Sequence, residues 1–202
     1  GDEASMMDAA KIYRFHLKDV DSANKVYKQI IDKLLNQAHS DDEVIFKVAK
    51  IYKDNLNDKK SAEQLLRPLV EKYLKLYESG SIEALEKAAD ISRNKLYDVS
   101  LTRKLYTQLA EQYLNDWDDG DIEALEKAAK IYRDILYDRN LSHKLYTQLA
   151  EQYLNDWKQS KSKSLNKNEN IEALVKAAEI YKTDLKDPDT AAELYQLLET
   201  ES

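Results

Sequence analysis

One segment of this chain occurs twice with few changes. Residues 82–117 and 122–157 agree at 28 of 36 positions, and the two copies start 40 residues apart. A fixed period of this size is typical of solenoids, in which each repeat buries its apolar faces against its neighbours. The chain is therefore expected to be a stack of similar units that offers an extended binding surface rather than a catalytic pocket.

Three further, weaker copies appear when the sequence is aligned on one alanine per repeat. Residues that align between repeats form a column, and each column is numbered by its distance in residues from that alanine. Most repeats have an aromatic residue at +3, and all five have leucine at +7 and aspartate at +9. The alanines of repeats one to five are Ala10, Ala49, Ala89, Ala129 and Ala178. The aspartates are Asp19, Asp58, Asp98, Asp138 and Asp187.

The apolar spacing predicts two helices in each repeat. In repeat four it runs 3, 4, 3, 4, the stripe of an amphipathic helix, through Ile122, Leu125, Ala129, Tyr132 and Leu136. The aspartate at +9 ends this first helix, helix A, and can cap the amides of a second, helix B. Helix pairs are expected near 5–38, 42–79, 82–118, 122–159 and 170–201, in a single solenoid over residues 1–202.

Two segments depart from the repeat pattern. Pro68 falls inside helix B of repeat two, where it removes a backbone hydrogen bond and is expected to kink the helix. Residues 158–170 are polar and lengthen the spacing between repeats four and five, which predicts a flexible, exposed insertion.

The alanine, aromatic and small-residue columns resemble the tetratricopeptide repeat over essentially the whole chain. In repeat four the matching residues are Ala129, Tyr132, Ser142 and Tyr146. The turn is about one residue longer than in that family, and the family's Trp, Gly and terminal Pro are missing. The resemblance implies an all-α, right-handed alpha-alpha superhelix of about five helix-turn-helix repeats. HEAT repeats share the period, but their helix-breaking prolines and their Asp and Arg positions are absent, so they come second.

Composition narrows the possible functions. A net charge of −7 opposes the binding of nucleic acid, and no apolar run is long enough to insert into a membrane. The chain has no cysteine, its three histidines lack metal or triad spacing, and no phosphate-binding motif is present. We therefore expect neither a cofactor nor enzymatic activity. A soluble protein, monomeric or weakly self-associating, is expected; a cytoplasmic location is favoured, and export stays open.

A basic residue follows the aromatic column in every repeat. These side chains are Arg14, Lys53, Arg93, Arg133 and Lys182 at +4, joined on the same helix face at +1 by Lys11, Lys50 and Lys130. One interpretation is a contact surface for an acidic partner. The other is that the cations compensate the helix dipole or are neutralised by a neighbouring repeat.

The resemblance implies an adaptor or scaffold. We expect a peptide or helix of a partner protein, acidic in one interpretation, to bind in the groove lined by the helices A. The alternative is a structural or self-assembling element that belongs to a longer array of repeats.

Overall fold

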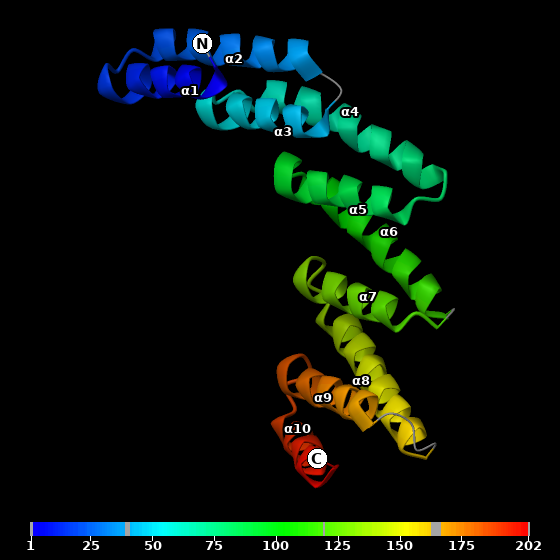
Figure 1. The fold of residues 1–202 in the computed structure, drawn as a ribbon. Coiled ribbons are helices and arrows are strands. Elements are labelled where there is room, and N and C mark those ends of the chain that lie inside the picture. The colour runs from blue at the N-terminus through cyan, green and yellow to red at the C-terminus, as the bar shows by residue number, and fades with distance from the viewer. Residues whose placement is uncertain (1, 39–40, 119, 163–166, 202) are drawn as a thin grey trace. The chain divides into compact units, whose positions relative to one another are not determined.

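A computed structural model describes residues 2–38, 41–118, 120–162 and 167–201 of the chain, and within these ranges it contains helices and no strand (Figure 1). Two helical segments form each repeat, as predicted. In repeats one to three, helix A is an α-helix that continues into a short π-helical segment, labelled η: α1 (Glu3–Lys11) with η1 (Ile12–His16), α3 (Asp42–Lys50) with η2 (Ile51–Asn55), and α5 (Ile82–Ile91) with η3 (Ser92–Leu96). In repeats four and five, helix A is α7 (Ile122–Asp134) and α9 (Lys167–Thr183). Helix B comprises α2 (Val20–Ala38), α4 (Lys59–Glu78), α6 (Val99–Asp118), α8 (Arg139–Ser162) and α10 (Pro188–Glu201).

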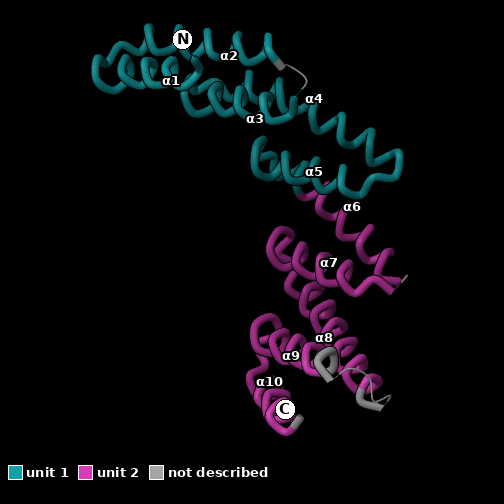
Figure 2. The backbone as a smooth tube through the Cα atoms, viewed as in Figure 1, with its two compact units in different colours: residues 1–102 teal, residues 103–202 magenta. Residues whose placement is uncertain are grey.

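The chain divides into two compact units, residues 1–102 and 103–202 (Figure 2). Unit 1 contains repeats one and two and the first helix of repeat three, and unit 2 contains most of α6 (Val99–Asp118) and repeats four and five. A single solenoid over residues 1–202 stays a prediction.

Each helix A ends in the same widened turn. The residue at +8 takes the left-handed conformation, with φ between 54° and 59°, although none of the five is glycine; they are Lys18, Asn57, Tyr97, Tyr137 and Lys186. The amide of the following aspartate then reaches back six residues, as in Asp19 N to Tyr13 O at 2.8 Å. The arrangement resembles a Schellman motif that is wider by one residue. It accounts for the longer turn noted in the sequence.

The aspartate at +9 caps helix B in all five repeats, as predicted. Its carboxylate accepts a hydrogen bond from the backbone amide three residues later, for example from Leu141 N to Asp138 at 3.0 Å. The other four pairs are Asp19 with Ser22, Asp58 with Ser61, Asp98 with Leu101 and Asp187 with Thr190. The sequence therefore places the helix boundary correctly, because the cap is local chemistry.

The core lies between the helices of each repeat and between adjacent repeats. The alanine that defines the alignment is buried in every repeat, at most 4% exposed. In unit 1, Ile31 and Leu34 of α2 pack in one cluster with Ile51 of the next repeat. In unit 2, Tyr153 and Trp157 of α8 pack against the buried residues of α9. Helix B of one repeat thus covers helix A of the next.

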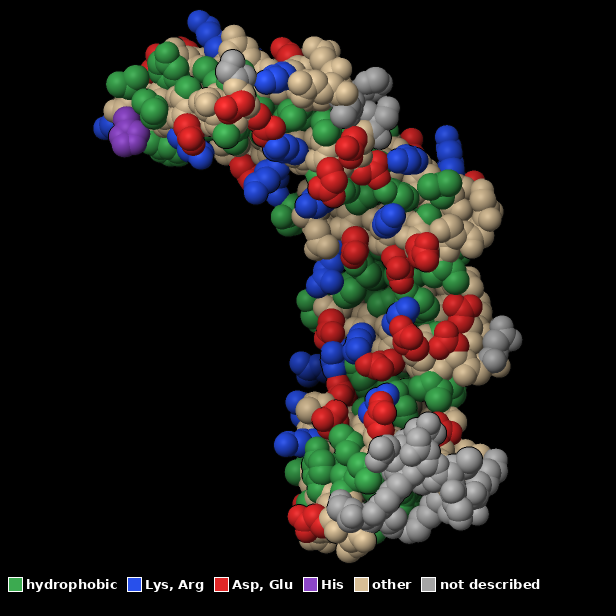
Figure 3. All heavy atoms as spheres, viewed as in Figure 1, with side chains coloured by type: hydrophobic (Ala, Val, Ile, Leu, Met, Phe, Trp, Pro, Cys, Tyr) green, Lys and Arg blue, Asp and Glu red, His purple; other side chains and the backbone are tan. Residues whose placement is uncertain are grey.

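The two departures from the repeat pattern have different outcomes. Helix α4 continues through Pro68 without a break. At the expected insertion over 158–170, α8 continues to Ser162 and α9 begins at Lys167, and the flexibility of this segment stays a prediction. Residues 163–166 of that segment lie outside the described residues. On the face shown in Figure 3, acidic and basic side chains are interspersed over both units.

Candidate partner-binding groove

A cavity of about 580 Å³ lies in unit 1, between helix A of repeat two and helix A of repeat three. Its apolar lining comes from three helices: Leu34 from α2, Phe46 from α3 and Leu66 from α4. A second cavity of about 300 Å³ shares several of its lining residues and extends toward Lys59. Together they form one groove, which we call the repeat 2/3 groove.

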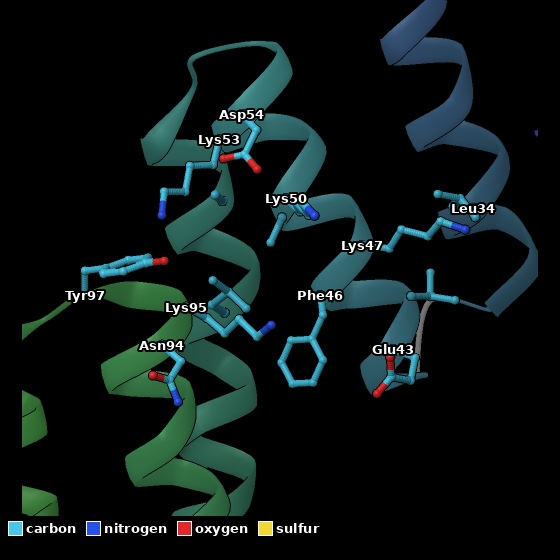
Figure 4. A pocket seen from close by; sticks show the side chains of 14 residues that line it. Leu34, Glu43, Phe46, Lys47, Lys50, Lys53, Asp54, Asn94, Lys95 and Tyr97 are labelled. Atoms are coloured by element: carbon cyan, nitrogen blue, oxygen red, sulfur yellow. The ribbon is translucent and has the colours of Figure 1, made fainter. Parts of the chain in front are cut away.

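Lysines predominate among the charged side chains of this groove (Figure 4). Lys47, Lys50 and Lys53 line it from α3 and η2, and Lys95 approaches from η3. The acidic side chains that line the larger cavity are Glu43 and Asp54. Lys47 forms an ion pair with Glu3 of repeat one at 2.5 Å. The other three lysines of the larger cavity stand against two acidic side chains, next to an apolar floor.

Two of these lysines lie against aromatic rings rather than carboxylates. The Lys53 Nζ lies 3.5 Å from the centre of the Tyr97 ring, and the Lys95 Nζ lies 5.1 Å from the centre of the Phe46 ring. Figure 4 shows both pairs at the edge of the cavity. A cation–π contact holds an ammonium group without neutralising it. These charges consequently stay available to an anionic ligand.

The corresponding groove of unit 2, between repeats four and five, has as many acidic as basic side chains in its lining. Its cavity measures about 260 Å³ and includes Arg133, the +4 residue that corresponds to Lys53. The Arg133 guanidinium bonds both oxygens of Asp134, at 2.7 and 2.9 Å, and also bonds Asp184 of the next repeat. The hydrogen bonds to Asp134, together with the nearby carboxylates, raise the pKa of Arg133. The Arg133 guanidinium is therefore already paired with carboxylates of the protein itself.

The other residues of the predicted basic surface differ in their contacts. Arg14 donates to the carbonyl oxygen of Asn55 in the next repeat and also lies over the Tyr27 ring. Lys182 lies 5.9 Å from the centre of the Tyr195 ring. Arg93 is exposed on η3. Lys11 pairs with Asp8 at 3.2 Å. Lys130 pairs with Glu126, four residues earlier on the same helix.

Arg133 pairs with a carboxylate of the next repeat, as the neutralisation interpretation expects. Arg14 contacts an uncharged carbonyl oxygen there, and Lys50 and Lys53 line an open groove. The role of the whole set as partner contacts stays a prediction.

One comparison with known proteins bears on the repeat itself. A protein-family model described as the tetratricopeptide repeat matches residues 172–201, which form most of repeat five. The columns of that repeat recur in the other four, and each recurrence has the same helix pair, the same left-handed turn and the same aspartate cap. The chain is a tetratricopeptide-like helical-repeat protein.

Two solved structures are similar to this tetratricopeptide-like protein in fold only. Both are crystal structures, one of a point variant, of a protein of Podosopora anserina that is named a kinesin light chain with nearly identical TPR-like repeats. The identity is 14% and the TM-score is 0.43, with 98% of this chain and 93% of the other covered. No curated protein matches the sequence.

Sequence reasoning missed part of the groove of this tetratricopeptide-like protein. Lys95 and Tyr97 lie in columns whose residue type changes from repeat to repeat, so alignment gave no signal for them. Phe46 and Lys47 lie on the N-terminal half of helix A, outside the basic columns at +1 and +4.

Within the described ranges, no group of three or more His, Cys, Asp or Glu side chains could hold a metal ion. Within the same ranges, no helix is both long enough and apolar enough to cross a membrane.

Proposed function

We propose that this protein is a non-enzymatic interaction scaffold whose repeat 2/3 groove binds an acidic segment of a partner protein. Helical repeats of this kind are typical of protein-interaction scaffolds. The observation that carries the finer proposal is the excess of lysine around an apolar cavity in unit 1. The same columns are neutralised in unit 2, so the excess is not a general property of the repeat.

The groove offers two kinds of contact side by side. Lys50, Lys53 and Lys95 can donate to carboxylates of the partner, while Phe46 and Leu66 can receive an apolar side chain between them. Charge-assisted hydrogen bonds are roughly twice as strong as neutral ones, and apolar burial adds affinity that salt does not screen. The best ligand is thus a segment in which acidic and apolar residues alternate.

The preformed groove lowers the entropic cost of binding such a segment. Lys53 and Lys95 are already held on rings at the edge of the cavity. Side chains that are ordered before binding lose less rotamer freedom when they meet a ligand. A carboxylate of the partner would approach these ammonium groups from the open side of the groove.

A defined peptide tests the proposal by fluorescence anisotropy. The probe is a labelled peptide in which Asp and Glu alternate with Leu and Phe. The double variant Lys50→Gln with Lys53→Gln is expected to bind it at least about tenfold more weakly, equal to about 1.4 kcal/mol. Binding to the wild-type chain should also weaken as salt is raised, because the Debye length falls to about 10 Å at 0.1 M.

The repeat provides a matched control. Lys130→Gln with Arg133→Gln changes the same two columns in repeat four and removes the same charge. This control is expected to bind the peptide as the wild-type chain does. An equal loss of affinity in both double variants, or binding that does not respond to salt, would contradict a site in the repeat 2/3 groove.

A further inference from the structure

Column +17 of helix B distinguishes repeat two from every other repeat. Repeats one, three, four and five have tyrosine in this column, whereas repeat two has leucine; the residues are Tyr27, Leu66, Tyr106, Tyr146 and Tyr195. Tyr27 and Tyr146 are buried, so their rings fill space inside the protein. Leu66 is buried too, but its side chain is shorter than that of tyrosine. Repeat two therefore lacks a ring that the other repeats supply themselves.

The basic residue at +4 shows where this ring lies in the repeat. In three repeats its charged group lies 5.1 to 5.9 Å from the centre of the +17 ring: Arg14 and Tyr27, Arg133 and Tyr146, Lys182 and Tyr195. These distances are within the range of a cation–π contact. In repeat two the ring is missing, and Lys53 lies over Tyr97 of the next repeat instead. Lys53 thus has no ring beneath it from its own helix B.

Open space accompanies the missing ring. Leu66 and Lys53 line both cavities of the repeat 2/3 groove, which measure about 580 and 300 Å³. In unit 2, Tyr146 and Arg133 line the corresponding cavity, which measures about 260 Å³. The larger space is found where the first repeat of the pair lacks the tyrosine.

A second replacement in repeat two adds an aromatic wall to this space. Phe46 stands in column −3, and the other repeats have Met7, Glu86, Glu126 and Val175 there. Phe46 and Leu66 line the larger cavity together, and Figure 4 shows the Phe46 ring projecting from α3 beside Lys95. Aromatic rings pack favourably against one another in offset or edge-to-face arrangements. Repeat two therefore lacks its own ring and offers a wall that suits a ring from outside.

The tyrosines of the other repeats also indicate which ring suits this position. The hydroxyl oxygens of Tyr27 and Tyr146 are buried and have no hydrogen-bond partner among the described residues. A buried hydroxyl group without a partner costs free energy. A ring without a hydroxyl group is thus expected to suit the position at least as well as tyrosine does.

We propose that an aromatic side chain of the acidic partner segment, best supplied by phenylalanine, occupies the space beside Leu66 in the repeat 2/3 groove. Its ring takes the place of the missing +17 tyrosine and lies within reach of Lys53, as Tyr146 lies beneath Arg133. Acidic residues next to the ring meet the lysines of the groove. This inference rests on the function proposed above and adds the residue that anchors the partner.

Three labelled peptides test the choice of ring by fluorescence anisotropy. Asp and Glu alternate with Leu in all three, and only the central residue changes: Phe, Tyr or Leu. The wild-type chain is expected to bind the Phe peptide about tenfold more tightly than the Leu peptide, and at least as tightly as the Tyr peptide. Nuclear Overhauser effects are expected between the Phe ring and the Leu66 methyl groups. Their absence would overturn the inference, whether or not any variant folds.

A variant that restores the ring provides the second test. Leu66→Tyr should fold, because tyrosine occupies this column in the other four repeats, and circular dichroism checks the fold. It should bind the Phe peptide about tenfold more weakly, which removes the difference between the Phe and Leu peptides. Leu76→Tyr is the matched control: the same change on the same helix, at a residue that is 46% exposed and lines neither cavity. This control should bind all three peptides as the wild-type chain does.

The outcomes separate this inference from the function on which it rests. Equal affinity for the Phe and Leu peptides, with both weakened in the double variant Lys50→Gln with Lys53→Gln, would overturn the aromatic anchor and leave the acidic-segment groove in place. A preference for Phe that persists in Leu66→Tyr, or that Leu76→Tyr also removes, would place the ring elsewhere and overturn the inference. A lack of binding by all three peptides would overturn both proposals.

Discussion

The repeat 2/3 groove and its counterpart between repeats four and five are built from the same columns but carry different charges. At +6 of the second repeat in each pair stands Lys95 in unit 1 and Asp184 in unit 2. Asp184 is only 12% exposed and binds Arg133, whereas Lys95 leaves Lys53 without a neutralising partner from the next repeat. One column thus decides whether the basic surface is internal structure or is open to a ligand.

The residue at +4 strengthens this difference. The planar guanidinium of Arg133 donates hydrogen bonds to Asp134 and to Asp184 at the same time. Lys53 has a single ammonium group, which lies over the Tyr97 ring. Arginine suits fixed, multidentate contacts with carboxylates, and lysine is a mobile point charge. Repeats with the same backbone can therefore carry a structural clamp in one groove and leave lysines open in the groove that we propose as a binding site.

The largest expected difference between the two grooves concerns packing. Ala129 is 0% exposed, so Ala129→Leu should overpack its contact and lower the free energy of unfolding by about 1–3 kcal/mol. Ala49 occupies the same column but lines the repeat 2/3 cavity, so Ala49→Leu has room and should lower it by less. Urea unfolding of both variants measures this; equal losses would mean that the cavity is not a feature of the folded chain.

Removing the clamp should give the next largest effect. Arg133→Gln leaves Asp184 without its cation and is expected to destabilise unit 2 by about 1–2 kcal/mol, a value kept low because the arginine is 41% exposed. Lys53→Gln should change stability by less than about 0.5 kcal/mol. Trp117 and Trp157 both lie in unit 2, so their fluorescence follows the unfolding of that unit. Similar midpoints for the two variants would remove the distinction between clamp and open site.

Acid should destabilise unit 1 more than unit 2. Burial alone would raise the pKa of Asp42, but the bonds from Tyr73 and Lys72 outweigh burial and lower it. Hydrogen bonds from the Ser22 and Ser61 side chains and amides lower the pKa of Asp19 and Asp58, and Thr190 acts in the same way on the pKa of Asp187 in unit 2. A lowered folded-state pKa stabilises the fold above the unfolded-state value of about 3.9. That stability is lost as the pH falls through the folded-state value.

The measurement compares urea unfolding at neutral and acidic pH. Circular dichroism reports both units and tryptophan fluorescence reports unit 2, so the circular-dichroism midpoint should fall further on acidification. The variant Asp42→Asn should reduce that extra loss. A fluorescence midpoint that falls at least as far as the circular-dichroism midpoint would show that the aspartates of unit 1 do not dominate.

Relief of backbone strain should give the smallest effect. Tyr137 is 77% exposed at a left-handed position, and Tyr137→Asn is expected to stabilise the chain by about 0.5–1 kcal/mol, because asparagine tolerates this conformation. Tyr97→Asn should gain less, since it also loses the ring contact with Lys53. Thermal unfolding tests both. A larger gain at Tyr97 would mean that its ring contributes nothing to the repeat 2/3 groove.

The sequence alone predicted the features that depend on local chemistry. The helix-turn-helix register follows from apolar spacing, and the aspartate caps follow from the need of each helix start for an acceptor. These interactions connect residues only a few positions apart, so a single chain segment contains all the information.

The tertiary structure decided which cations are available. Arg14 and Arg133 differ from Lys53 in what the next repeat presents to them: the carbonyl of Asn55, the carboxylate of Asp184 and the ring of Tyr97. Those partners lie about one repeat away in sequence, in columns that vary freely, so periodicity gives no sign of them. The sequence shows that the turn is longer but not that it is left-handed, because none of the five residues at that position is glycine. Local patterns determined the helices and their caps, whereas contacts between repeats determined where the surface is open and charged.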